Sequence, residues 1–158
     1  KDAHEKAYEY LYEAAKIVPE DPLVLNNLAF QMARLGKDPF KAVELAEKAL
    51  AKGGDSPEQL ALFLDTLGYA QLKAGLKAHA ESTLKRSLQT KPLACNYMHL
   101  GNVYMAQDRP AAARKMFELA QKAATEDNDD TSLRELEPFL EEAKMREAEK
   151  KKQTAARK

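Results

Sequence analysis

Apolar residues along this chain recur at every third or fourth position, in runs separated by short polar segments that contain glycine or proline. Leu25, Leu28 and Met32 form one such stripe, and Tyr97 and Leu100 begin another. This spacing places the side chains on one face of an α-helix. The pattern therefore predicts an all-α protein, with helices at residues 3–17, 22–35, 39–52, 57–74, 77–90, 93–107, 110–124 and 132–150.

Turn-forming residues support these boundaries. Gly36 and Gly75 follow apolar runs, as C-cap residues do. Ser132 and Glu135 have the spacing of a capping box at the start of the last helix, where Pro138 is expected to introduce a kink or delay the start. Four other prolines stand near predicted helix starts, where a missing N–H costs little: Pro22, Pro39, Pro57 and Pro110.

The stripes themselves repeat along the chain. Two consecutive copies agree at every spacing and lie 33 residues apart: Leu64-x-x-Leu67-Gly68-x-x-Gln71 followed by Ala80-x-x-x-Leu84-x-x-Ser87, and Tyr97-x-x-Leu100-Gly101-x-x-Tyr104 followed by Ala113-x-x-x-Phe117-x-x-Ala120. Two further segments fit the same scheme, one as a whole copy and one as a second half only: Leu25-x-x-Leu28-Ala29-x-x-Met32 with Ala42-x-x-x-Ala46-x-x-Ala49, and Ala7-x-x-x-Leu11-x-x-Ala14. Small residues at matching positions let two antiparallel helices approach closely.

These residues resemble the tetratricopeptide repeat, a helix pair of about 34 residues, over positions 3–124. The resemblance implies a right-handed superhelix of antiparallel helix pairs with a C-terminal capping helix, and indicates the C-terminal part of a longer array. The expected segments are 1–19 (second helix of a truncated repeat), 20–56, 57–92 and 93–126 (repeats), 127–150 (capping helix) and 151–158 (disordered basic tail).

Charge and composition narrow the classes of partner. The 25 basic and 25 acidic residues cancel, so we expect no nucleic-acid partner. No apolar run approaches the ~18 residues of a membrane span. Cys95 is the only cysteine, which leaves both cytoplasmic and cell-envelope localisation open.

The candidate binding surface comes from the resemblance, because the first helix of each pair lines the inner face of such arrays. Off-core residues on these helices mix aromatic, amide and charged groups, which suits a peptide or helix of a partner protein. The predicted partner-binding residues are Asn26, Phe30, Arg34, Asp65, Tyr69, Lys73, Met98, Asn102 and Met105. The alternative for the aromatic and methionine residues is packing between adjacent helices.

Some tetratricopeptide domains bind the acidic tails of heat-shock chaperones through a clamp of lysine, asparagine and arginine residues. Here Phe30, Thr66, Cys95 and His99 stand where that clamp needs amide or basic groups, so we do not predict binding of such tails. Cys95 and His99 are four residues apart on one helix, but two ligands do not complete a metal site. No phosphate loop, nucleophile elbow or dinucleotide motif occurs, and we expect neither catalysis nor a cofactor.

The sequence thus predicts a protein-interaction scaffold or adaptor with a peptide-binding groove. One alternative is a self-associating assembly module, because the half repeat at the start leaves an apolar helix face uncovered. Another is the non-catalytic targeting region of a larger enzyme or of an export or envelope-assembly protein. The stretches Asn26-Asn27-Leu28-Ala29 and Asp65-Thr66-Leu67-Gly68-Tyr69 look like those of long bacterial repeat proteins of the latter kind.

Overall fold

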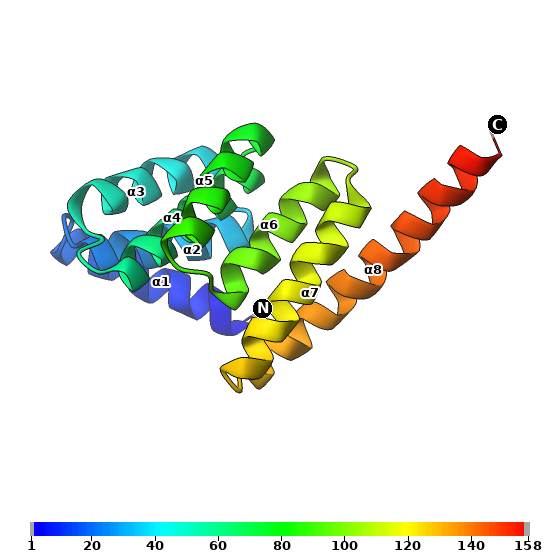
Figure 1. Cartoon of the computed structure of the whole chain (residues 1–158). Coiled ribbons are helices and arrows are strands. Elements are labelled where there is room, and N and C mark those ends of the chain that lie inside the picture. The colour runs from blue at the N-terminus through cyan, green and yellow to red at the C-terminus, as the bar shows by residue number, and fades with distance from the viewer. Residues whose placement is uncertain (1, 157–158) are drawn as a thin grey trace. The chain divides into compact units, whose positions relative to one another are not determined.

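A computed structural model describes residues 2–156 of the chain (Figure 1), and within them every regular element is helical. The helices are joined by short turns, and consecutive helices run antiparallel within residues 2–90 and within residues 94–155. In chain order they are α1 (Asp2–Ile17), α2 (Pro22–Leu35), α3 (Pro39–Lys52), α4 (Pro57–Lys73), α5 (Lys77–Thr90), α6 (Ala94–Ala106), α7 (Pro110–Glu126) and α8 (Asp130–Ala155). The predicted all-α fold of antiparallel helix pairs is confirmed.

The chain forms two compact units, Lys1–Lys91 and Pro92–Lys158. In the first unit each of α1 to α4 packs on the next helix along the chain, and α2 also lies beside α4. In the second unit α6 packs on α7, α7 packs on α8, and α8 touches α6.

Small residues on the second helix of each pair make close packing possible. Ala42 and Ala46 of α3 are fully buried beneath Leu28 and Met32 of α2, and Leu67 of α4 joins the same core cluster. Where the first helix of a pair carries a glycine, the two helices of the pair approach each other more closely. A Cβ atom on Gly68 would lie 2.5 Å from Leu84 Cγ, and one on Gly101 would lie 2.3 Å from Phe117 Cε1. Only glycine fits these two positions without displacing a buried side chain.

Polar and glycine residues in the turns fix the ends of α2 and α4. Asp21 caps α2 by accepting hydrogen bonds from the amides of Leu23 and Val24, both at 2.9 Å. Gly36 is the C-cap of α2 and adopts the left-handed conformation, with φ of 70°. The C-cap of α4 is Ala74 rather than Gly75, which follows it with φ of 79°.

The last helix differs from the prediction at both ends. Its N-cap is Asp129, which accepts a hydrogen bond from the Ser132 amide at 3.1 Å, so a capping box led by Ser132 is wrong. A carboxylate accepts more strongly than a hydroxyl, and the helix starts at Asp130, two residues earlier than predicted. Pro138 lies inside the helix and does not delay its start.

At the other end, residues 151–155 are helical where a disordered tail was predicted; Arg157 and Lys158 lie outside the described residues. Extending an existing helix needs no new nucleus, and this segment contains good helix formers. Lys150 also binds Asp108 in the turn before α7, at 2.6 Å between Nζ and Oδ2. Lys150 and Asp108 are 42 positions apart in the sequence, so local sequence patterns could not predict this contact.

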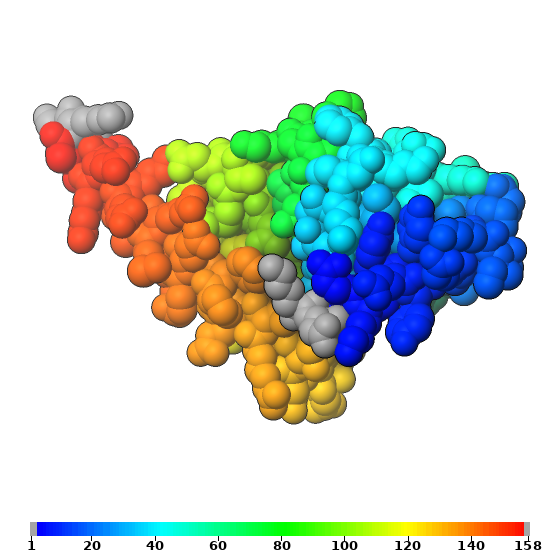
Figure 2. All heavy atoms as spheres, turned by 180° about the vertical axis from the view of Figure 1, so that it is seen from behind, coloured from blue at the N-terminus to red at the C-terminus, as the bar shows by residue number. Residues whose placement is uncertain are grey.

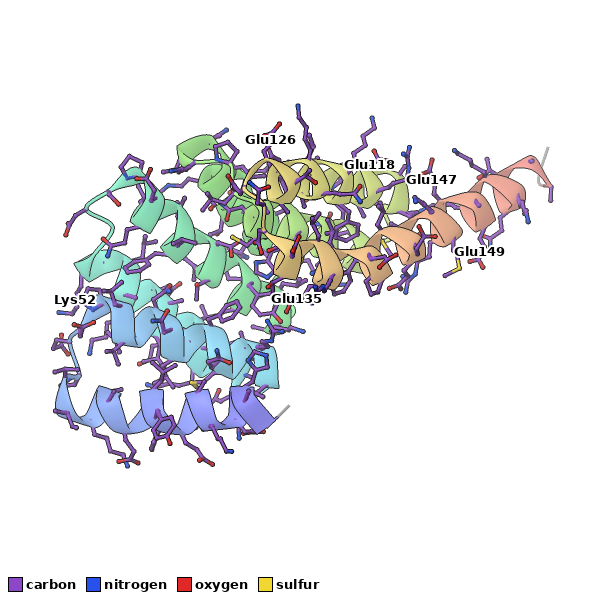
Figure 3. The ribbon with its side chains drawn as sticks, turned by 90° about the horizontal axis from the view of Figure 1, so that it is seen from below. Lys52, Glu118, Glu126, Glu135, Glu147 and Glu149 are labelled. Atoms are coloured by element: carbon purple, nitrogen blue, oxygen red, sulfur yellow. The ribbon has the colours of Figure 1, made fainter. Side chains whose placement is uncertain are left out.

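Glu20, in the turn between α1 and α2, forms salt bridges with two lysines of α3. Its carboxylate binds the ammonium groups of Lys48 and of Lys52, the latter at 2.5 Å and labelled in Figure 3. Hydrogen bonds from Lys48 and then Lys52 lower the pKa of Glu20 from 4.5 to about 2.

This lowered pKa predicts a pH dependence of stability. A carboxyl group whose pKa is lower in the folded than in the unfolded state stabilises fully above pH 4.5, and the effect is lost as the pH falls towards 2. The melting temperature of Glu20→Gln should therefore lie below that of the wild type at neutral pH, and the difference should shrink as the pH is lowered through this window. A constant difference across the window would show that Glu20 does not act through its charge.

Candidate partner-binding surface

In the first unit, four residues of α2 each have a chemically similar counterpart on α4, and each such pair forms a row across the two helices. Leu23, Asn27, Phe30 and Arg34 recur at intervals of three or four residues along α2, on one face of the helix. Each has a counterpart on α4 that lies 39 positions later: Leu62, Thr66, Tyr69 and Lys73. Because α2 packs beside α4, the two helices together carry an apolar, a polar, an aromatic and a cationic row. We call these residues the α2–α4 face. In the polar row Asn27 is exposed, whereas Thr66 is buried, with 4% of its surface exposed.

The aromatic row is a direct contact between two of the predicted binding residues. The ring centroids of Phe30 and Tyr69 lie 5.6 Å apart with an interplanar angle of 39°, within the range of favourable aromatic pairs. Both side chains are half-buried, so each also presents part of its surface to solvent. The Lys73 ammonium lies 5.2 Å from the Tyr69 ring centroid, as a cation–π contact requires.

The cationic row stands at the C-terminal ends of the two helices. Arg34 lies in the last turn of α2 and Lys73 in the last turn of α4, and both are exposed. Positive charge is favourable there because a helix C-terminus carries partial negative charge. This end of the α2–α4 face therefore combines apolar ring surface with positive charge.

Two predicted binding residues lie beneath the surface. Asn26 is 7% exposed and Asp65 is 4% exposed, so neither offers much area to a partner. The Nδ2 group of Asn26 donates to Asn27 Oδ1 at 3.4 Å, whereas its Oδ1 atom accepts no hydrogen bond from the protein. Among the described residues this oxygen is thus a buried acceptor without a hydrogen-bond donor.

The remaining three predicted residues belong to the second unit. Met98, Asn102 and Met105 follow one another at helical spacing on α6, and all three are half-buried. On the same helix the Cys95 thiol donates to Asn96 Oδ1 at 3.0 Å. Among the described residues, no group of three or more histidine, cysteine, aspartate or glutamate side chains has an arrangement that could hold a metal ion.

The apolar row was not predicted from the sequence. Leu23 is 51% exposed and Leu62 is 44% exposed, unusually open for leucines in helices that otherwise supply the core. The signal was present, because both residues share the separation of 39 positions that relates Phe30 to Tyr69. Leucines at helical spacing are more often assigned to packing than to recognition.

In the second unit, Arg114 of α7 links α7 to α8 through the carboxylate of Glu147, and it also binds Glu118 of its own helix; the two carboxylates lie close together in Figure 3. Its Nε atom is 2.6 Å from Glu147 Oε2. Hydrogen bonds from Lys151 and Arg114 lower the pKa of the Glu147 carboxyl. After Glu147, α8 runs past the start of α7. An open cleft of about 710 Å³ lies there, lined by Pro110, Ala111 and Ala155 among others.

The helix pairs and their stripes of small residues define a tetratricopeptide-repeat solenoid, and the chain has this fold. No protein-family model matches the sequence. No curated protein sequence matches it either. No helix among the described residues combines the length and apolar character that crossing a membrane requires.

Several solved structures have similar folds. The APC/C hetero-tetramer Cut9–Hcn1 aligns with a TM-score of 0.67 at 21% identity, over 85% of this chain but 26% of the other. The type IV pilus biogenesis factor PilW aligns with a TM-score of 0.62 at 24% identity, over 86% of this chain and 68% of PilW. MamA aligns with a TM-score of 0.56 at 20% identity, over 94% of this chain and 91% of MamA. At these identities the likeness is one of fold alone.

Proposed function

We propose that this chain is an adaptor that binds a segment of a partner protein on the α2–α4 face. One observation supports the proposal: on the adjacent helices α2 and α4, the half-exposed pair of Phe30 and Tyr69 lies between the polar row and the cationic row. Rigid aromatic surface beside a cation is typical of the residues that dominate the energy of protein interfaces. The chain acts by binding in this proposal, and no covalent chemistry is needed.

The rows indicate the chemistry of the bound segment. Apolar side chains would cover Leu23, Leu62 and the aromatic pair, while an acidic group would meet Arg34 and Lys73. We therefore expect a segment with apolar residues followed or preceded by an acidic one.

The double variant Tyr69→Ala with Arg34→Ala tests this proposal. Loss of one aromatic anchor and one cation should weaken partner binding by about 10- to 100-fold or more, the usual effect of removing interface hot spots. Helical content should remain, because neither side chain is fully buried. The measurement is capture of partners from a lysate of the source cells by immobilised protein, read by mass spectrometry.

A matched control comes from α1, where Lys16 lies 4.6 Å from the Tyr12 ring centroid in the same kind of cation–π contact. The double variant Tyr12→Ala with Lys16→Ala removes the same chemistry away from the α2–α4 face. Proteins lost with the first variant and retained with the second support the adaptor function. If both variants capture the same proteins as the wild type, the α2–α4 face is not the binding surface.

A further inference from the structure

A cavity of about 300 Å³ opens between α1 and α3 in the first unit, with α2 at its base. Its floor is aliphatic and comes mainly from three residues of α2 that are 2–7% exposed, with Leu45 of α3 beside them: Leu25, Leu28 and Met32. Three ammonium groups line the same cavity, whereas no carboxylate among the described residues lines it: Lys16, Lys41 and Lys48. We call this cavity the α1–α3 pocket.

A small residue on α1 accounts for the open space. The offset of 35 positions that relates Ala7 of α1 to Ala42 of α3 also relates Ala15 to Leu50. Leu50 packs against the core cluster that contains Phe63, whereas Ala15 offers a single methyl group to the core in the preceding repeat. Alanine in the place of leucine leaves a cavity where the surrounding side chains do not close in.

The mouth of the α1–α3 pocket lies away from the stripe by which α1 would join a helix of its own repeat. That stripe consists of Ala7, Leu11 and Ala14, which match the buried residues of α3, α5 and α7. Tyr12 and Lys16, which line the pocket, lie on a different side of α1. A helix packed on the stripe would therefore leave the pocket open, with α1 still at the surface of the first unit as in Figure 2 (blue).

Two of the ammonium groups stand at the same end of the α1–α3 pocket. Lys16, in the last turn of α1, lies 4.6 Å from the ring centroid of Tyr12. Lys48 Nζ donates to the Pro19 carbonyl oxygen at 3.2 Å, just after α1. Lys41 stands two turns earlier on α3, towards the other end. Each lysine also binds a glutamate outside the lining, but such exposed pairs contribute little to stability, so an anion can compete for the ammonium groups: Glu13, Glu44 and Glu20.

We propose that the α1–α3 pocket binds an unbranched acyl chain that ends in a carboxylate, as in a fatty acid. The chain lies on the floor, which follows α2 for about 10 Å from Leu25 to Met32. The carboxylate lies at the end where Lys16 and Lys48 stand. An aliphatic floor offers no hydrogen-bond partner and so selects an apolar chain, while a lining whose charges are all positive selects an anion.

This site is separate from the proposed partner-binding surface. Leu25, Leu28 and Met32 point to the opposite side of α2 from Phe30 and the rest of the α2–α4 face. The acyl ligand and a partner protein can therefore be bound at the same time, and each proposal can fail without the other.

Decanoate, kept below the concentration at which it forms micelles, is the probe for the α1–α3 pocket. We expect a dissociation constant on the order of 0.1–1 mM, which suits a ligand of about a dozen heavy atoms. In ¹H–¹⁵N NMR titrations, saturable shifts should be confined to the three segments that line the pocket, residues 12–19, 25–32 and 41–48. Acetate carries the charge alone and decyltrimethylammonium carries the chain with the opposite charge, so both should bind at least 10-fold more weakly.

Substitutions separate the two parts of the site. Ala15→Leu should fill the pocket and weaken decanoate binding at least 10-fold without lowering the melting temperature. The same change at the exposed Ala51 of α3 is the matched control and should bind as the wild type does. Lys16→Gln with Lys48→Gln should weaken decanoate binding several-fold and leave the binding of decyltrimethylammonium no weaker than before.

Circular dichroism establishes that each variant is folded, and the lysine variant keeps the test decisive if Ala15→Leu does not fold. Titrations of the wild type without saturable shifts in the three segments would overturn the proposal. Equal affinity for decyltrimethylammonium would do so as well, because the pocket would then not select an anion. Unchanged binding by folded Ala15→Leu would place the probe outside the α1–α3 pocket and contradict the proposal.

Discussion

Replacing Phe117 by alanine should lower the free energy of unfolding of the second unit by about 3–5 kcal/mol, the usual cost of removing a fully buried phenylalanine. The ring is 0% exposed and lies against Gly101 of α6. On its other side it stacks with Phe139 of α8, with 5.9 Å between ring centroids. One substitution therefore removes contacts from the α6–α7 interface and from the α7–α8 interface. Chemical denaturation followed by circular dichroism measures the loss.

Phe139→Ala is the control for this prediction. The Phe139 ring makes the same stacking contact, but it is 37% exposed, so its removal leaves less of a cavity and should cost clearly less than the removal of Phe117. Equal losses for the two substitutions would mean that the stacking contact alone, and not packing against the Gly101 backbone, accounts for the stability that Phe117 provides.

Helix positions were predictable from the sequence because periodicity and turn chemistry coincide. The bounds of α2 and α3 match the prediction, since Pro22 and Pro39 stand at the first helical positions and Gly36 ends α2 in a left-handed conformation. The start of α8 was not predictable in the same way. Four consecutive residues, Asp127 to Asp130, can all cap a helix, and the turn geometry that selects Asp129 depends on Asn128 at φ of 55°.

The candidate site was predictable in part. The register that brings Phe30 beside Tyr69 is present in the sequence as a constant separation of 39 positions. The burial of Asn26 and Asp65 could not be predicted from the sequence. Helical spacing gives only the direction in which a side chain leaves its own helix. Whether a residue at the edge of such a stripe is covered depends on how closely α2 and α4 pack, which follows from side chains on both helices.

A glutamate distinguishes α8 from the first helices of the repeats. Leu133, Leu136 and Leu140 of α8 have the spacing of Tyr97, Leu100 and Tyr104 in α6, and Glu137 takes the place that Gly101 holds there. At Gly101 even a Cβ atom would lie 2.3 Å from the side chain on the neighbouring helix. The exposed carboxylate of Glu137 is therefore incompatible with the same close approach of a further helix, which agrees with a capping role for α8.

The same close approach makes Gly68 a sensitive position in the first unit. Gly68→Ala should destabilise this unit by about 1–3 kcal/mol through overpacking, although alanine is the better helix former. The added methyl group would lie 2.5 Å from Leu84 Cγ, a branched carbon of a side chain that is itself 0% exposed and cannot swing away. Thermal or urea denaturation of the variant gives the change in unfolding free energy.

A double-mutant cycle with Leu84→Ala identifies the cause of this loss. Alone, Leu84→Ala should cost about 2–5 kcal/mol because it leaves a cavity. In the double variant the new methyl group occupies part of that cavity, so the combined loss should be smaller than the sum by about 1 kcal/mol or more. Additive losses would show that Gly68 is required for its backbone and not for the space that it leaves to Leu84. A combined loss below the sum would establish that helix proximity in this repeat is set by the pair, as Gly101 and Phe117 set it in the next.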